Sequence, residues 1–113
     1  MIREMSDHHV RHPAVDELEL GAVLHALSDP VRLRIVRELA VHGACNCGTF
    51  AVPVAKSTLS HHLRVLREAG LTLTEPSGTQ RVVSLRRDDV DARFPGLLDA
   101  VLAAAADATS TVA

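Results

Sequence analysis

Side chains able to bind nucleic acid are concentrated in residues 56–70, KSTLSHHLRVLREAG. One set is polar, recurs at helical spacing and would share one face: Ser57, Ser60, His61 and Arg64. A second set is apolar and would form a stripe on another face: Leu59, Leu63 and Leu66. A short helix with one face for a core and one for hydrogen bonds and phosphates suits the DNA major groove. An ordinary amphipathic surface helix would show the same pattern, so the rest of the chain decides between them.

The ends of this helix are marked by residues with known end preferences. Ser57 can serve as the N-cap of a helix that begins at Thr58. Gly70 can end the helix in a left-handed conformation.

A second group of residues could bind a metal ion. Cys45 and Cys47 are one residue apart, so two thiolates could reach one soft or borderline ion, and further ligands must come from elsewhere. The N-terminal stretch offers imidazoles at His8, His9 and His12. A mixed sulfur and nitrogen site suits Ni, Zn or Cu. The alternatives are that the two cysteines pack as small hydrophobes or act as redox thiols.

The charge is unevenly distributed along a chain whose net charge is −2. Residues 54–87 carry six Lys and Arg against two Asp and Glu, a local +4. Residues 88–113 carry one against five, a local −4. Because the local field attracts phosphate, the basic third of the chain is the candidate DNA-binding region.

Composition excludes several classes of protein. At 113 residues the chain is expected to form one domain. Two Phe and no Trp or Tyr argue against binding of single strands by base stacking. We find no nucleophile–base pairing, phosphate-binding loop or complete metal triad, so we expect no enzyme. The N-terminus lacks the apolar segment of a signal peptide and no run is long enough to span a bilayer, so we expect a cytoplasmic protein without a membrane partner.

The elements that would position these residues can be read in chain order. Residues 14–27 predict a first helix, and Asp29 followed by Pro30 predicts the start of a second that ends at Gly43. Its inward residues are expected to be Val31, Ile35, Val36 and Leu39, with Arg32, Arg34 and Arg37 pointing elsewhere. Residues 44–55 allow about one helical turn, since Pro53 limits any helix there.

A hairpin and a final helix follow. LTLTE and QRVVSLRR predict two strands joined at Ser77–Gly78, a wing whose charges would be Arg81, Arg86 and Arg87. Asp88 or Asp89 is expected to cap a short turn, and Pro95 to open a last helix. Its apolar side is Leu98, Val101, Leu102 and Ala105.

The predicted fold class is mainly α with a small β-hairpin, a winged helix-turn-helix that dimerises through its first and last helices. We expect a mobile N-terminal arm over residues 1–13, a DNA-binding and dimerisation domain over 14–106, and a disordered tail over 107–113.

Two motifs and the hairpin together resemble the ArsR/SmtB family of bacterial winged-helix regulators. They are LSDPVRLRIVREL at 27–39 and STLSHHLRVLREAGL at 57–71, and the similarity covers roughly residues 15–105. The resemblance implies a homodimer that places two recognition helices in successive major grooves of a near-palindromic operator. It also implies repression relieved by a signal, although activation is an alternative.

The resemblance assigns roles to residues at matching positions. The DNA-facing positions are Lys56, Ser57, Thr58, Ser60, His61 and Arg64, with Arg81 on the wing. Arg67 is expected to contact phosphate, and His62 to pack and hydrogen-bond within the fold.

Many members of this family sense metals. One family site uses Cys-x-Cys with ligands from the partner's N-terminal arm, which matches Cys45 and Cys47. A second family site on the last helix lacks its histidine here, since residues 89–113 contain none.

The sequence therefore predicts a double-stranded DNA-binding transcriptional regulator that responds to a signal or metal. The alternatives are a small metal-handling or thiol-redox protein without DNA binding, a protein-interaction module, and a regulator that relies on a second sensor protein.

Overall fold

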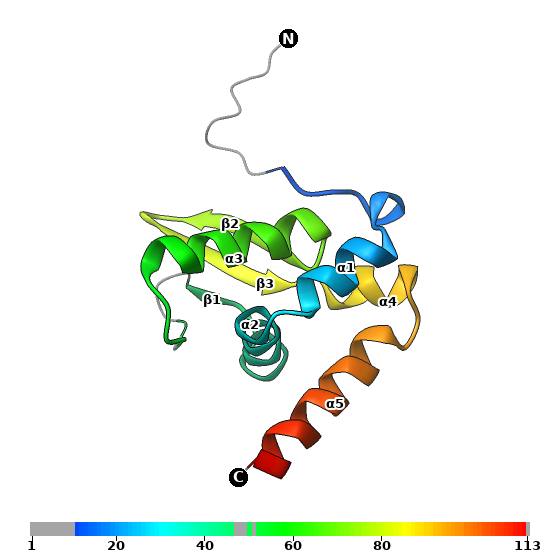
Figure 1. Ribbon diagram of the computed structural model, residues 1–113. Coiled ribbons are helices and arrows are strands. Elements are labelled where there is room, and N and C mark those ends of the chain that lie inside the picture. The colour runs from blue at the N-terminus through cyan, green and yellow to red at the C-terminus, as the bar shows by residue number, and fades with distance from the viewer. Residues whose placement is uncertain (1–10, 47–49, 51, 113) are drawn as a thin grey trace.

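The computed structural model describes residues 11–46, 50 and 52–112, with side chains as far as residue 106 (Figure 1). Its helices, in chain order, are η2 (Val15–Glu17), α1 (Leu20–Leu27), α2 (Pro30–His42), α3 (Lys56–Ala69), α4 (Arg87–Arg93) and α5 (Leu97–Val112). Its strands are β1 (Cys45–Asn46), β2 (Thr72–Ser77) and β3 (Gln80–Leu85). The mainly helical prediction with a small hairpin is confirmed.

The strands form one antiparallel sheet in the order β1-β3-β2. The hairpin between β2 and β3 was predicted, but its tip is Gly78–Thr79, one residue later than expected. Gly78 has a φ of 64°, the left-handed conformation that such a turn requires. The third strand was not predicted, because two residues, Cys45 and Asn46, are too few to show an alternating pattern.

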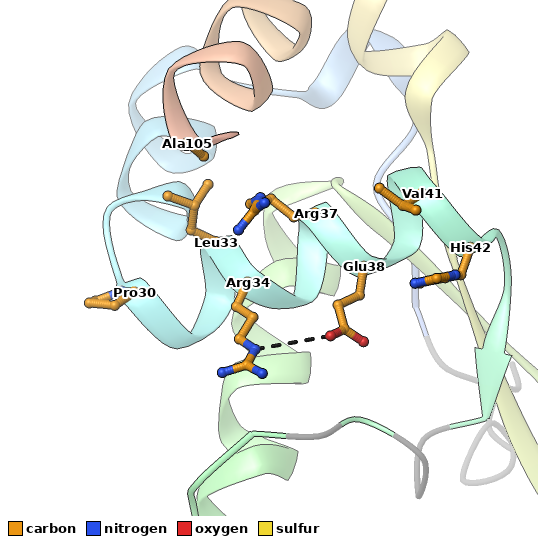
Figure 2. Close-up of a pocket in the computed structure, with 8 residues that line it drawn as sticks. All are labelled: Pro30, Leu33, Arg34, Arg37, Glu38, Val41, His42 and Ala105. Atoms are coloured by element: carbon orange, nitrogen blue, oxygen red, sulfur yellow. Dashed lines mark ion pairs between the residues drawn. The ribbon is translucent and has the colours of Figure 1, made fainter. Parts of the chain in front are cut away.

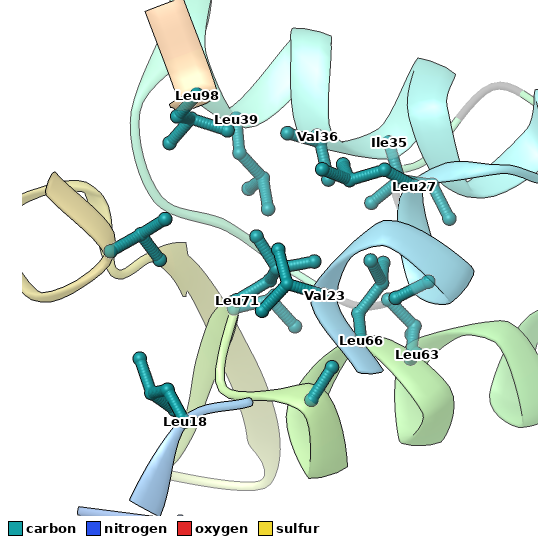
Figure 3. Close-up of a cluster of buried hydrophobic side chains, with 14 of the residues drawn as sticks. Leu18, Val23, Leu27, Ile35, Val36, Leu39, Leu63, Leu66, Leu71 and Leu98 are labelled. Carbon is teal, nitrogen blue, oxygen red and sulfur yellow. The ribbon is translucent and has the colours of Figure 1, made fainter. Parts of the chain in front are cut away.

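The core lies where α1, α2 and α3 meet (Figure 3). Ile35, Val36 and Leu39 of α2 are buried, as their spacing predicted. Leu63 and Leu66 of α3 are buried in the same cluster. These aliphatic contacts hold the helix with the polar face in a fixed place on the domain.

The helix predicted over residues 14–27 is interrupted. Leu18 and Glu19 have extended backbones, which separate η2 from α1. The break lets the side chain of Leu18 bury itself almost completely. The Leu18 carbonyl, which has no helical partner, accepts a hydrogen bond of 3.0 Å from Nε of Arg93. Burial and this tertiary bond therefore outweigh the local preference for a continuous helix.

The expected start of α2 is confirmed. The Asp29 carboxylate accepts hydrogen bonds from the backbone N–H groups of Val31 at 2.9 Å and Arg32 at 3.1 Å. Pro30 occupies the first helical position, and Gly43 follows the helix with a φ of 81°.

The start of α3 was predicted two residues too late. Leu59 N–H donates to the Ala55 carbonyl at 2.9 Å, so the first turn begins at Lys56 and Ser57 lies inside it rather than capping it. The other end is confirmed, since Gly70 has a φ of 89° in the left-handed region.

The starts of the last two helices also differ from the prediction. Arg86 precedes α4, and neither Asp88 nor Asp89 caps it; the Asp89 carboxylate instead accepts from Nε of Arg86 at 3.0 Å. The last helix begins at Leu97 rather than Pro95, because Gly96 has a φ of 82°. Its backbone is helical through Val112, where the sequence predicted a disordered tail.

Candidate nucleic-acid interface

One face of α3 is polar, basic and open to solvent. Its side chains are all exposed: Lys56, Ser57, Thr58, Ser60, His61 and Arg64. They lie in the first two and a half turns, the part of a recognition helix that reaches base edges. Glu68, one turn beyond Arg64, is also exposed and marks the acidic end of this face.

Two side chains on this face, Arg64 and His61, contact each other. NH2 of Arg64 lies 3.3 Å from Nδ1 of His61. Because a guanidinium is always protonated, the imidazole nitrogen must accept. The remaining N–H groups of Arg64 stay available for a bidentate contact with a base or phosphate.

The opposite side of α3 is anchored in the core. Leu63, Leu66 and Ala69 are buried and Leu59 is half-buried, as the predicted apolar stripe requires. His62 is only 9% exposed. Its Nδ1 lies 3.2 Å from NH1 of Arg32, which confirms that His62 hydrogen-bonds within the fold.

Arg32 corrects the prediction for α2. It was expected to point away from the core, yet it is only 7% exposed. Its Nε donates to the Ala26 carbonyl at 2.8 Å and its NH2 to the His25 carbonyl at 3.2 Å. The signal was present in the spacing, since Arg32 stands three residues before Ile35 and recurs with the buried stripe.

The hairpin lies beside α3, which packs against β2. In Figure 1 the hairpin tip and the N-terminal end of α3 are on the same side of the molecule. Arg81, one residue from the tip-side end of β3, is exposed. This arrangement is that of a wing that can reach the phosphate backbone next to the groove-reading helix.

Two other arginines expected on the wing lie elsewhere. Arg86 follows β3 and is paired with Asp89. Arg87, in α4, pairs with Asp99 of α5. Both are therefore held by carboxylates at the base of the hairpin.

Arg67 occupies a different environment from the exposed face of α3. It is half-buried and borders a hollow with Arg11, Pro13, Glu17 and Glu68. Its Nε is buried and, among the residues that the structure describes, has no hydrogen-bond partner.

The residues proposed as metal ligands are only partly described. Cys47, His8 and His9 lie outside the described residues. Cys45 is half-buried in β1, where its thiol donates to the Gly43 carbonyl at 3.3 Å. Within residues 11–46, 50 and 52–112, no three His, Cys, Asp or Glu side chains gather as a metal site would require.

His12 and Cys45 lie at opposite edges of the sheet. Val83 of the central strand pairs with Cys45 on one side and with Thr74 on the other. Nε2 of His12 accepts a hydrogen bond of 3.0 Å from the Thr74 N–H at the outer edge of β2. One chain therefore does not bring these two candidate ligands together.

The surroundings of His12 favour its neutral form. Burial, together with the charges of Arg86 and Arg67, lowers the pKa of His12 below its ordinary 6.5, and Glu75 opposes this only in part. A neutral imidazole is what the hydrogen bond from Thr74 requires.

The helix α3 is anchored in the core and has an exposed basic face, and it lies next to a hairpin with an exposed arginine. This arrangement is that of the winged helix-turn-helix class of DNA-binding proteins. Comparison with known proteins agrees. A family model described as a helix-turn-helix domain matches residues 27–75.

The chain is also similar to named regulators. It is 40% identical over 87 residues to an uncharacterized HTH-type transcriptional regulator of Bacillus subtilis, covering 74% of this chain and 87% of that protein. It is 32% identical over 74 residues to an arsenical resistance operon repressor of Staphylococcus xylosus, covering 65% of this chain and 71% of that protein.

Solved structures show the same relationship. A possible transcriptional regulator for arsenical resistance superposes with a TM-score of 0.59 at 31% identity, over 73% of this chain and 84% of that one. The repressor BigR from Xylella fastidiosa gives 0.55 at 30% identity, over 66% and 85%. The chain belongs to the ArsR family of helix-turn-helix transcriptional regulators, and its function is DNA-binding regulation of transcription. No helix among the described residues is long and apolar enough to cross a bilayer.

Proposed function

We propose that this chain regulates transcription as a homodimer that inserts α3 of each subunit into the major groove of a near-palindromic operator. The observation that carries the proposal is the exposed polar face of α3 beside a wing with an exposed arginine. Arg64 and His61, with Ser57 and Ser60, would contact base edges, since these side chains supply the donors and acceptors that base edges match. Lys56, Thr58 and Arg81 would contact phosphates and fix the register of the protein on the duplex.

The position of Arg67 in its hollow should limit the phosphate contact that we propose for it. Arg67 is half-buried and borders this hollow together with the acidic residues Glu17 and Glu68, so its contribution to DNA binding should be smaller than that of the exposed Arg64.

The proposed dimer surface combines α1 and α5. Leu20 and Leu24 of α1 are 47% and 45% exposed, high values for large apolar side chains. In Figure 1, α5 extends away from the rest of the domain, so much of its length is open to a second subunit. A dimer would cover this apolar surface and set two recognition helices at a fixed separation.

A groove lies between α2 and α5 (Figure 2). Its volume is about 620 Å³, and it is lined by Leu33 and Val41 of α2, by Ala105 of α5, and by the guanidiniums of Arg34 and Arg37. Val41 is 75% exposed. The apolar and cationic lining of the groove suits a segment of the partner subunit that carries both leucines and acidic residues, such as the stretch from Asp16 to Leu24.

The decisive experiment measures binding of the protein to duplex DNA from its own promoter region over a range of salt concentrations. A regulator of this kind should bind with an affinity that falls steeply with salt and exceeds its affinity for a scrambled duplex. Arg64→Ala should weaken binding and relax sequence preference, whereas Arg11→Ala, an exposed arginine outside α3, the wing and the proposed dimer surface, should not. Weak binding that is indifferent to sequence would overturn the proposal.

We further propose that the Cys45–Cys47 pair, with histidines of the N-terminal arm, senses a metal ion such as Ni, Zn or Cu. Two observations support this. Cys45 is half-buried at the start of a strand rather than fully packed in the core, and two similar proteins carry names that refer to arsenical resistance. Since His12 lies across the sheet from Cys45, the arm would have to complete such a site from the partner subunit.

A further inference from the structure

A single buried guanidinium connects three helices of this domain. Arg32 of α2 donates to the carbonyls of His25 and Ala26 in α1, at 3.2 and 2.8 Å, and to Nδ1 of His62 in α3, at 3.2 Å. Both Arg32 and His62 are almost fully buried. A buried charge of this kind persists only where its donors are satisfied, so this set of hydrogen bonds is specific rather than incidental.

The hydrogen bonds to α1 fall at the end where a helix needs donors. α1 ends at Leu27, so the carbonyls of His25 and Ala26 belong to its last turn. The His25 carbonyl also accepts from the backbone N–H of Ser28 at 3.1 Å and from its hydroxyl at 2.6 Å, whereas the Ala26 carbonyl accepts from Nε of Arg32. The guanidinium supplies the donor for Ala26, adds a further donor for His25, and places positive charge at the negative end of the helix dipole. Its planar fork reaches two carbonyls and one imidazole at once, which a lysine ammonium cannot do.

The hydrogen bond to α3 fixes the state of His62. Since Arg32 can only donate, Nδ1 of His62 must accept and the ring proton resides on Nε2. The Asp29 carboxylate oxygen that caps α2 lies 3.8 Å from the same Nδ1. The imidazole, next to the proposed base-contacting His61, is thereby held by the junction of α1 and α2.

We propose that Arg32 is a positioning residue for DNA recognition, which sets the orientation of the reading face of α3 relative to α1. This inference rests on the proposed function. Because α1 carries the exposed leucines of the proposed dimer surface, the same guanidinium would set the distance and angle between the two recognition helices of a dimer. It would therefore determine which spacing of operator half-sites the protein accepts.

The test uses two probes: a duplex that the wild-type protein selects from a randomised library, and a scrambled duplex of the same composition. Arg32→Lys keeps the charge but not the fork. It should lower affinity for the selected duplex by about tenfold or more and leave affinity for the scrambled duplex within about twofold. The control is Arg11→Lys, an exposed arginine outside the polar face of α3, the wing and the proposed dimer surface, which should change neither affinity.

A second measurement compares affinities for duplexes that differ in the spacing of their half-sites. If Arg32 only stabilised the fold, its substitution would not change the preferred spacing. Among duplexes whose half-sites are moved apart or together by one base pair, the wild type should show a sharp optimum, and Arg32→Lys should lose it. If folded Arg32→Lys keeps the wild-type affinity ratio and optimum, the proposal is wrong. If the wild type itself selects no sequence, the proposed function fails instead.

A second pair of variants keeps the test decisive if Arg32→Lys does not fold. His62→Gln retains an oxygen that can accept from Arg32, whereas His62→Leu fills similar space without an acceptor. At matched melting temperatures, His62→Gln should preserve the ratio of selected to scrambled affinity and the spacing optimum, and His62→Leu should lose both. Equal behaviour of the two variants would contradict a positioning role.

Discussion

The side chain of Leu18 occupies the space in which a β-carbon on Gly70 would lie: an added Cβ would stand 1.9 Å from Cδ2 of Leu18. Leu18 cannot move aside easily, because it is 1% exposed and belongs to the core. The end of the recognition helix and the extended segment before α1 are therefore packed directly against each other.

Gly70→Ala should consequently destabilise the protein strongly. The left-handed backbone and the forced displacement of Leu18 together should cost about 2–4 kcal/mol of unfolding free energy. Gly78→Ala is the matched control, since Gly78 also has a positive φ but no neighbour within 4 Å of an added Cβ. It should cost only about 1–2 kcal/mol. Urea unfolding of the two variants measures the difference, and equal losses would show that the packing of Leu18 on Gly70 is unimportant.

Asp29→Ala should remove about 1–2 kcal/mol of stability, because two backbone N–H groups of α2 lose their acceptor. Asp88→Ala, which removes an exposed carboxylate that caps nothing, should change stability by less than about 0.5 kcal/mol. Thermal or denaturant unfolding of both variants tests this.

The contribution of Asp29 should also depend on pH. Burial by itself raises the pKa of this carboxyl, but the N–H groups of Arg32 and Val31 and the charge of Arg32 bring it below its ordinary 3.8. The carboxylate thus stabilises the fold above that ordinary value, and the benefit is lost as pH falls through the lowered pKa. The stability gap between wild type and Asp29→Ala should narrow in acid; a gap that stays constant would show that the charge is irrelevant.

His12 should release the edge of β2 when it becomes protonated. Its pKa is lowered in the folded protein, so the neutral imidazole stabilises this edge above the ordinary pKa of 6.5, and the stabilisation disappears as pH falls through the lowered value. Amide hydrogen exchange at Thr74, corrected for its intrinsic pH dependence, should accelerate over that range. His12→Gln offers an acceptor that does not titrate, so its Thr74 amide should show no such transition.

Arg81→Ala should weaken binding to specific and scrambled duplexes by similar factors. It should reduce the slope of log affinity against log salt by about 0.9 for each phosphate that the variant no longer neutralises. Arg64→Ala should instead reduce discrimination between operator and variant duplexes, by about 1–3 kcal/mol at the base it contacts. Fluorescence anisotropy titrations at several salt concentrations separate the two behaviours, and a sequence-specific loss in Arg81→Ala would reassign this residue to base reading.

Substitution of Cys45 and Cys47 by Ser should weaken binding of Ni, Zn or Cu and abolish any effect of that metal on DNA affinity. The weakening is expected because thiolates supply the strongest ligands of the proposed site. Calorimetric titration of each metal into both proteins gives the comparison. Unchanged metal affinity in the double variant would eliminate the cysteine site.

Local signals in the sequence were sufficient for much of this fold. Asp29 and Pro30 predicted the start of α2, and the stripe through Leu63 and Leu66 predicted the buried side of α3. Such features depend on residues a few positions apart, which a sequence displays directly. The exposed polar face of α3 followed from the same periodicity.

The features that were missed depend on distant partners. The break at Leu18 is stabilised by Arg93 and by packing on Gly70, and the burial of Arg32 depends on carbonyls of α1 and on His62. The same is true of Arg86 and Arg87, whose charge suggested the wing but whose carboxylate partners hold them at its base. Tertiary contacts of this kind override helical propensity and charge pattern.

The hydrogen bond between His12 and Thr74 also has a consequence for the solubility of the protein. Within the described sheet β2 is an edge strand, and an edge with free N–H groups is a template for pairing with another chain. Here the Thr74 donor is occupied by His12, Pro76 two residues on has no N–H to offer, and Glu75 between them is an exposed charge. Residues 11–14, which include His12, are therefore expected to hinder pairing of β2 with a strand of another chain, and their removal should make the protein less soluble even where DNA binding is intact.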